Sequence, residues 1–350
     1  MHDDQDDIKV DVPADAVDPD AGHESELPPR KQRSILAELT KDRLTLLVLC
    51  TTAVGYIIAD PIRIEWARFG WTLLGTGLAA AAAGMLNQLL EEQRDRKMNR
   101  TRQRPLPSGR VGRITVLVIG VVAGYVGVSV LAGMVNLASA GLALSNLLIY
   151  LLLYTPLKTQ TTLNTLVGAV CGAIPPMIGW VAVTGLFQPG AWLLGTILFV
   201  WQIPHFMALA WMYRDDYQRG GFRMLPVIDH DGRLTCEVIL ATSLILIPLG
   251  LAGTMLGLAG WLYAIGSTFL GLWLTVLSVR LYRSRSNRNA RSVFLASITY
   301  LPLLLILMVV DRGPINPRAW FQGGRMVIQE QPLDDSLPAT NTMTKEDEDA

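Results

Sequence analysis

Long apolar runs recur along this chain, and they constrain its fold more than any other feature. Nine of them approach the roughly 20 residues that a helix needs to cross a bilayer. Because a chain in hydrocarbon must satisfy its backbone hydrogen bonds within each segment, these runs predict helices. We expect spans at 44–59, 69–90, 114–133, 137–154, 163–183, 191–213, 237–256, 259–279 and 292–310. The sequence therefore predicts an all-α polytopic membrane protein.

Charge divides the chain into three parts. Residues 1–40 are acidic and then basic, and the ten Asp and Glu residues within 1–29, with almost no apolar content, predict disorder. Residues 41–311 hold the spans, and residues 312–350 form a polar tail. The N-terminal part lacks the apolar core of a signal peptide and is too acidic for a transit peptide. We therefore expect a bacterial membrane protein rather than an imported organelle protein.

Basic residues are unevenly distributed between the two sides of the predicted membrane. With the N-terminus inside, 24 Lys and Arg residues fall in inner segments and six in outer segments. Because cytoplasmic loops carry such an excess, we expect the N-terminus in the cytoplasm and the C-terminus outside. An even number of spans separates the loops 91–113, 155–162 and 214–236 from one another. These three loops therefore lie on one face in either orientation.

A run of polar residues begins at the end of the second predicted span. Asn87, Glu91 and Asp95 recur every four residues, a spacing that stacks side chains along a helix. Two carboxylates at this spacing can bind Mg²⁺ while water and a substrate phosphate complete its coordination. Arg100 and Arg104 follow, and guanidinium groups bind phosphate oxygens through two hydrogen bonds. The alternative is a cytoplasmic loop whose charges only follow the positive-inside rule. That alternative accounts for the arginines but not for the alignment of Asn87, Glu91 and Asp95.

The other two loops on this face carry further polar groups. Asp215 and Asp216 are adjacent and do not share one helix face, and the glycines that follow indicate a helix end or loop. They form either an exposed turn or the second half of a metal–diphosphate clamp. Lys158 is the only basic residue between Arg113 and Arg214. It either extends toward the membrane surface or contacts a diphosphate.

Two predicted spans contain residues that are unusual inside a membrane. His205 is the only one of four histidines within a span, and Pro204 before it removes a backbone donor. The histidine is either hydrogen-bonded and buried, or it contacts an acidic substrate group or a heme. Gly172, Pro175 and Pro176 either bend or break a helix beside a cavity or allow close helix packing.

These residues belong to longer strings that resemble a known family. The strings are Asn87-xxx-Glu91-xxx-Asp95, MNRTRQRP at 98–105, YTPLK at 154–158, GAVCGAIPPMIGW at 168–180 and WQIPHFMALAWMYRDDYQRGGFRMLPV at 201–227. They are similar to the UbiA-type intramembrane prenyltransferases, and the last string resembles the branch that farnesylates heme. The resemblance covers roughly residues 40–310, and the general family pattern has Asp in place of Glu91.

The resemblance implies nine helices around a central cavity and Mg²⁺-dependent transfer of a farnesyl group from farnesyl diphosphate to a vinyl group of heme B. Water addition then gives heme O and diphosphate, for heme A and terminal-oxidase biogenesis. Heme B is thus a substrate, and the bilayer and a downstream heme A synthase are expected partners. The implied catalytic residues are Asn87, Glu91, Asp95, Lys158, Asp215 and Asp216, of which Glu91, Asp95, Asp215 and Asp216 would bind metal. The implied substrate-binding residues are Arg100, Arg104, Tyr154, His205 and Arg214.

Three other functions remain open. A related enzyme would prenylate a quinone precursor instead of heme. A transporter would commonly place charges near the membrane midplane, whereas the polar residues here collect at one face. A heme-binding assembly factor would bind heme without turnover. Nucleic-acid binding is not expected, because the basic residues follow membrane sidedness and have few aromatic residues among them.

Overall fold

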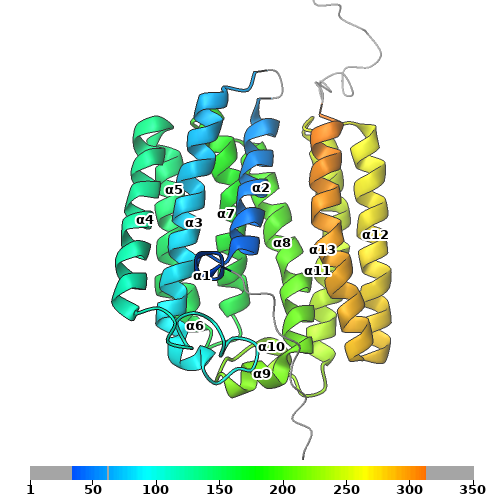
Figure 1. Cartoon of the computed structure of the whole chain (residues 1–350). Helices are drawn as coiled ribbons and strands as arrows, with labels where there is room; N and C mark the ends of the chain where they lie inside the picture. The colour runs from blue at the N-terminus through cyan, green and yellow to red at the C-terminus, as the bar shows by residue number, and fades with distance from the viewer. Residues whose placement is uncertain (1–33, 61–62, 313–350) are drawn as a thin grey trace, which may run out of the picture.

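The computed structural model of the chain describes residues 34–60 and 63–312 (Figure 1). Within these ranges, nine helices are long and apolar enough to cross a membrane, which confirms the all-α class and the nine predicted spans. Of the predicted N-terminal tail, residues 1–33 lie outside the described residues, and residues 35–39 form a short helix. The predicted C-terminal tail lies outside the described residues from position 313 onward.

Eight spans are single helices, and the fourth is composite. The single helices are α2 (Asp42–Ala59), α3 (Trp66–Asp95), α4 (Arg113–Met134), α7 (Asn164–Thr184), α8 (Pro189–Met212), α11 (Arg233–Met255), α12 (Trp261–Ser284) and α13 (Asn287–Val310). The fourth span joins α5 (Leu137–Leu148), the π-helix η1 (Ile149–Tyr154) and α6 (Thr155–Leu157). The remaining short helices are α1 (Ile35–Leu39), α9 (Arg214–Arg219) and α10 (Leu225–Ile228). The loop predicted to begin at residue 91 begins after Asp95 instead, because α3 continues beyond the apolar run.

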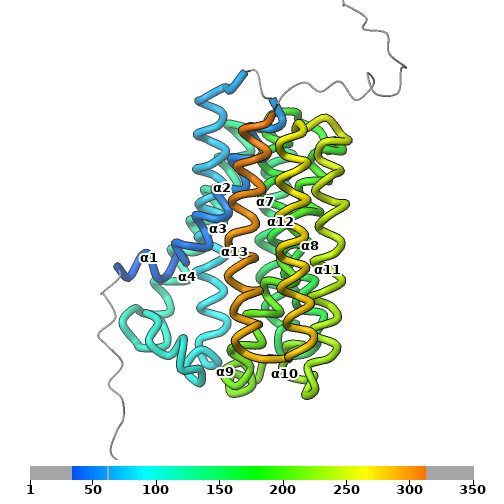
Figure 2. Tube along the Cα trace, turned by 90° about the vertical axis from the view of Figure 1, so that its right-hand side faces the viewer, coloured from blue at the N-terminus to red at the C-terminus, as the bar shows by residue number. Residues whose placement is uncertain are grey.

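The three polar loops meet at one end of the bundle, as span parity predicts. Figure 1 shows α6, α9 and α10 at the lower end of the bundle, whereas α13 ends with its C-terminus at the upper end. The Arg223 backbone N–H donates to the Lys158 carbonyl at 2.7 Å, which joins the second and third loops. Helix α1 lies at the side of the bundle beside the loop after α3 (Figure 2), where Arg110 donates to Glu38 at 2.8 Å. The polar chemistry of the described chain is therefore gathered on one face.

Helices α7 and α8 are the most buried spans. Helix α7 continues through Pro175 and Pro176 without a break, and of the two open alternatives close packing fits Gly172. A β-carbon at Gly172 would lie 2.1 Å from Gln202 Oε1 of α8. The irregular turn is η1, which the sequence did not predict, and such π-helical turns frequently occur at functional sites.

Gly179 sets how closely α2 approaches α7. A β-carbon there would lie 1.9 Å from the carbonyl oxygen of Thr52, and no side-chain rotation relieves a contact with backbone. We expect Gly179→Ala to separate the helices at a cost of about 1–3 kcal/mol, the usual range for overpacking. The midpoint temperature of thermal denaturation in detergent should fall. It is measured by size-exclusion chromatography of samples heated to a series of temperatures. Gly141→Ala in α5 is the matched control, because no atom lies within 4 Å of its β-carbon; equal midpoints for both variants would contradict this prediction.

Candidate active site

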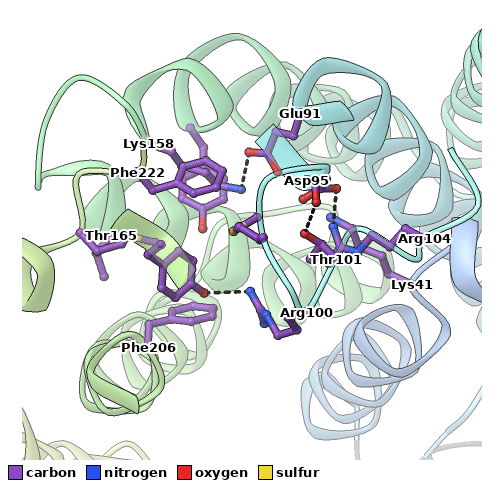
Figure 3. Close-up of a pocket in the computed structure, with 14 residues that line it drawn as sticks. Lys41, Glu91, Asp95, Arg100, Thr101, Arg104, Lys158, Thr165, Phe206 and Phe222 are labelled. Atoms are coloured by element: carbon purple, nitrogen blue, oxygen red, sulfur yellow. Dashed lines mark hydrogen bonds and ion pairs between the residues drawn. The ribbon is translucent and has the colours of Figure 1, made fainter. Parts of the chain in front are cut away.

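A cavity of about 670 Å³, including its open mouth, lies at the end of the bundle where the three loops meet (Figure 3). We call it the charged cavity. Its lining comes from the residue before α2, the end of α3 and the following loop, the η1–α6 turn, helices α7 and α8, and the segment after α8. The lining residues are Lys41, Glu91, Asp95, Met98, Arg100, Thr101, Arg104, Tyr154, Lys158, Thr165, Phe206, Tyr217, Phe222 and Met224.

Two buried carboxylates on the last turns of α3 face this cavity, each paired with a base (Figure 3). Lys158 Nζ donates to Glu91 Oε1 at 2.8 Å, and Arg104 Nη1 donates to Asp95 Oδ2 at 2.7 Å. Burial alone would lower the pKa of Lys158, but Tyr154 and the Glu91 carboxylate raise it above its usual range. The Lys158 amine therefore stays charged. The predicted alignment of Glu91 and Asp95 on one face is confirmed.

Asn87 lies one turn farther from the mouth and does not line the charged cavity. Its side chain is fully buried, and its Oδ1 accepts a hydrogen bond from Lys41 Nζ at 2.6 Å. Its Nδ2 donates to Thr155 Oγ1 at 3.0 Å. Asn87 therefore holds a lysine and the start of α6 in place, on the same helix as the two carboxylates.

Asp216 holds the loop that follows α3. Its carboxylate accepts the backbone N–H groups of Asn99 at 3.2 Å and Arg100 at 3.3 Å, and it pairs with Arg219. Burial would raise the pKa of Asp216, but the hydrogen bonds from Arg219, Asn99 and Arg100 hold it below its usual value. The Arg100 guanidinium in turn donates to the Tyr217 hydroxyl at 3.3 Å inside the charged cavity. The two acidic segments are thus joined through this loop.

Five predicted site residues lie outside the cavity lining. Two of them, Asn87 and Asp216, hold neighbouring segments as described above, and the other three are Asp215, Arg214 and His205. Asp215 is exposed, and its nearest basic contact is Arg214 Nε at 3.9 Å. His205 Nδ1 lies 2.9 Å from Ser297 Oγ of α13, and its ring stacks on Phe294 at 4.9 Å between centroids. The structure therefore shows a hydrogen-bonded histidine between helices, and the predicted heme contact of His205 stays a prediction.

The donor chemistry of the charged cavity fits a divalent cation that binds together with a phosphate. Among the described residues, no three His, Cys, Asp or Glu side chains form a metal-binding cluster. Glu91 and Asp95 nevertheless offer two oxygen donors one turn apart, and Mg²⁺ is commonly held by one or two carboxylates plus water and substrate phosphates. Arg100, Arg104 and Lys158 supply donors for those phosphates.

Lys41 is the one charged residue of the cavity lining that the sequence did not predict. It precedes the first span, where a basic residue is fully explained by membrane sidedness. The aromatic residues Phe206, Tyr217 and Phe222 also line the cavity, and they belong to the string 201–227 that carried the resemblance. For Lys41 the sequence gives no separate signal.

A second cavity adjoins the first one and extends among α2, α3, α5 and α7. We call it the apolar cavity, because most of its lining surface is apolar. Its volume, again including the space at its open mouth, is about 980 Å³, and it shares Lys41, Tyr154 and Phe206 with the charged cavity. A molecule with an anionic head and an apolar tail would therefore find both environments side by side.

Sequence comparisons show which proteins this chain resembles. Residues 48–298 match the UbiA prenyltransferase family. A protoheme IX farnesyltransferase of Solibacter usitatus is 44% identical over 284 residues, which cover 79% of this chain and 97% of that protein. One from Salinibacter ruber is 39% identical and covers 78% and 96%. A human protein named protoheme IX farnesyltransferase, mitochondrial, is 42% identical and covers 80% and 62%.

Solved structures share the fold. A digeranylgeranylglyceryl phosphate synthase has a TM-score of 0.68 at 15% identity, covering 79% of this chain and 97% of its own. A UbiA homologue from Archaeoglobus fulgidus bound to DMAPP and Mg²⁺ has a TM-score of 0.57 at 16% identity, covering 79% and 100%. The nine-helix arrangement described above is therefore the UbiA-like fold.

Proposed function

Because this chain belongs to the UbiA prenyltransferase family, we propose that it transfers the farnesyl group of farnesyl diphosphate to protoheme IX. It is a prenyltransferase whose relatives at about 40% identity are consistently protoheme IX farnesyltransferases. The observation that carries the proposal is that the charged and apolar cavities are adjacent and share Lys41, Tyr154 and Phe206 in their linings. Farnesyl diphosphate has a polar head and an apolar tail that match these two environments.

The diphosphate binds in the charged cavity. Arg100, Arg104 and Lys158 donate hydrogen bonds to its oxygens, and Arg104 and Lys158 are already held in place by Asp95 and Glu91. Glu91 and Asp95 would hold Mg²⁺, which neutralises charge on the leaving diphosphate when bound. We propose Asp215 and Asp216 as the acidic groups of the opposite rim, with Asp216 also fixing the loop that presents Arg100.

Breaking the C1–O bond of farnesyl diphosphate gives diphosphate and an allylic cation. The basic residues stabilise the negative charge that develops on the leaving group, and such preorganised groups act strongly where water is excluded. Tyr154 and Phe206 each line both cavities. Their π faces can stabilise cationic carbon there. The apolar lining beyond them limits hydrolysis of the cation.

The vinyl group of protoheme IX supplies the electrons for the new bond. Its π electrons attack C1 of the farnesyl cation, which leaves a cation beside the pyrrole ring. One water adds to that carbon and loses a proton, giving a hydroxyethylfarnesyl side chain. Farnesyl diphosphate, protoheme IX and water are thus converted into heme O and diphosphate.

The protein is a multi-pass membrane protein, and we propose that the charged cavity opens to the cytoplasm of a bacterial cell. The excess of basic residues on that face supports this orientation. The product would pass to a downstream heme A synthase. Heme and the farnesyl tail are both apolar enough to partition into the bilayer, which gives them access to the apolar cavity from the membrane.

The proposed function is tested by product formation. Purified protein with Mg²⁺, protoheme IX and farnesyl diphosphate should yield heme O, identified by mass spectrometry. Removal of Mg²⁺ with EDTA should abolish the product, and added Mg²⁺ should restore it. Farnesylation of 4-hydroxybenzoate but not heme would indicate a quinone-type prenyltransferase instead. Heme binding without turnover would indicate an assembly factor, and heme flux across liposomes would indicate a transporter.

A further inference from the structure

Lys41 stands at the boundary between the two cavities. It lines both of them, and its Nζ donates to Asn87 Oδ1 at 2.6 Å. Along α3, Asn87 is one turn farther from the mouth than Glu91, which corresponds to about 6 Å at 1.5 Å per residue. The ammonium group therefore lies on the membrane side of the two paired carboxylates.

The direct contact partners of this ammonium group are neutral, and the Glu91 carboxylate acts on its charge only from a longer distance. Besides Asn87, they are the Tyr150 hydroxyl, 3.4 Å away, and the Tyr150 ring, 5.8 Å from centroid to Nζ. Lys158 and Arg104 each have a carboxylate partner in the charged cavity. Within the described ranges, no carboxylate forms an ion pair with Lys41. Its charge is thus available to an anionic group of a substrate.

The backbone at Lys41 is held in an uncommon conformation. Its φ of 52° and ψ of 53° place it in the left-handed region, one residue before α2 begins. The preceding carbonyls of Glu38 and Leu39 are fixed by hydrogen bonds from Gln88 Nε2 at 3.0 and 2.8 Å. Strained residues persist where the surrounding structure holds them, and they cluster at ligand-binding sites. Neighbouring residues of α3 thus hold both the backbone before Lys41 and its side chain.

The proposed reaction forms a carbon cation near Lys41, so a positive charge on Lys41 without an anionic partner would disfavour the reaction. Farnesyl C1 becomes cationic next to the charged cavity, and a second positive charge nearby would raise the energy of that cation. An anion on the acceptor that pairs with Lys41 would remove this repulsion. Protoheme IX carries two propionate groups, and carboxylates pair readily with lysine ammonium groups.

We propose that Lys41 binds a propionate carboxylate of the porphyrin acceptor and thereby orients the acceptor at the cavity junction. This inference rests on the proposed heme farnesylation. Arg100, Arg104 and Lys158 bind the diphosphate, whereas Lys41 binds the second substrate, the porphyrin. Asn87 keeps the ammonium group directed toward the boundary of the two cavities.

The test compares the protein and the acceptor in one double-mutant cycle. Steady-state rates are measured for the wild type and Lys41→Met, each with protoheme IX and with its dimethyl ester, in which the propionates are uncharged. We expect Lys41→Met to lower kcat/KM for protoheme IX at least about tenfold while KM for farnesyl diphosphate stays within about twofold. The ester should cause a similar loss in the wild type and no further loss in Lys41→Met. Lys41→Arg should recover part of the activity with protoheme IX.

Lys97→Met is the matched control, because Lys97 is exposed on the same face and lines neither cavity; it should retain wild-type kinetics with both acceptors. Independent losses from the ester and from Lys41→Met would overturn the inference, and so would a raised KM for farnesyl diphosphate, which would assign Lys41 to the diphosphate. If Lys41→Met does not fold, wild-type protein that uses the ester as well as protoheme IX still overturns it. Failure of the wild type to farnesylate either acceptor would instead refute the proposed function.

Discussion

Replacing Glu91 by glutamine is expected to reduce heme O formation by about 10³-fold, the scale of losing one preorganised electrostatic group in an active site. Glutamine keeps the shape of the side chain but is a much weaker ligand for Mg²⁺. The change also removes the ion-pair partner of Lys158, whose Nζ lies 2.8 Å from Glu91 in the charged cavity. The loss should fall mainly on kcat, because the missing interaction acts as the diphosphate leaves.

Glu92→Gln provides the matched control. Glu92 is a buried carboxylate at the same end of α3, but it pairs with Arg96 at 2.6 Å and Arg113 at 3.1 Å, and it does not line the cavity. Single-turnover assays should therefore show nearly wild-type chemistry for Glu92→Gln. Equal losses in the two variants would mean that burial of a charge at this helix end, rather than cavity chemistry, explains the effect of Glu91.

Asp216→Ala is expected to cost about 100-fold in activity, because small displacements of positioning groups have effects of this size. The change removes the acceptor for the Asn99 and Arg100 backbone N–H groups. Buried donors that lose their acceptor favour rearrangement of the segment that carries them. Arg100 should then leave its position against Tyr217, and the proposed contribution of Asp216 to metal binding is lost in the same variant.

Limited trypsin digestion separates these two effects of Asp216→Ala. The loop 96–112 contains several Lys and Arg residues, so its release should accelerate cleavage there even without substrate. Asp231→Ala is the control, because Asp231 is exposed on the same face and is remote from that loop in the sequence. Full activity in Asp216→Ala, with a wild-type digestion pattern, would refute both proposed roles.

The fold was predictable because every segment that crosses the hydrocarbon of the membrane must be apolar and must satisfy its own backbone hydrogen bonds. All nine spans follow from apolar run length, and the meeting of three loops follows from counting crossings. The boundaries are less predictable at the polar end. Helix α3 continues four residues past the first charged positions, because its terminal carboxylates find bases on neighbouring segments and need no water.

The site was predictable where residues share one helix and less so elsewhere. Glu91 and Asp95 were identified from a four-residue spacing that the helix preserves. Lys41 was not, because its role depends on contacts with Asn87 and Tyr150, which lie 46 and 109 positions away. For His205 the sequence left two roles open, a buried hydrogen bond or a substrate contact. The hydrogen bond to Ser297 is visible only once α13 packs against α8.

The residues that line the charged cavity gather at the end of the bundle where α6, α9 and α10 lie (Figure 1). In the proposed reaction, farnesyl diphosphate binds and diphosphate leaves at this same end. No ionic group of that substrate crosses the hydrocarbon during turnover, although moving one charge across a membrane at 100 mV involves about 2.3 kcal/mol. The exchange of farnesyl diphosphate for diphosphate is therefore thermodynamically independent of the transmembrane voltage, and a cell that loses its membrane potential retains the same driving force for this step.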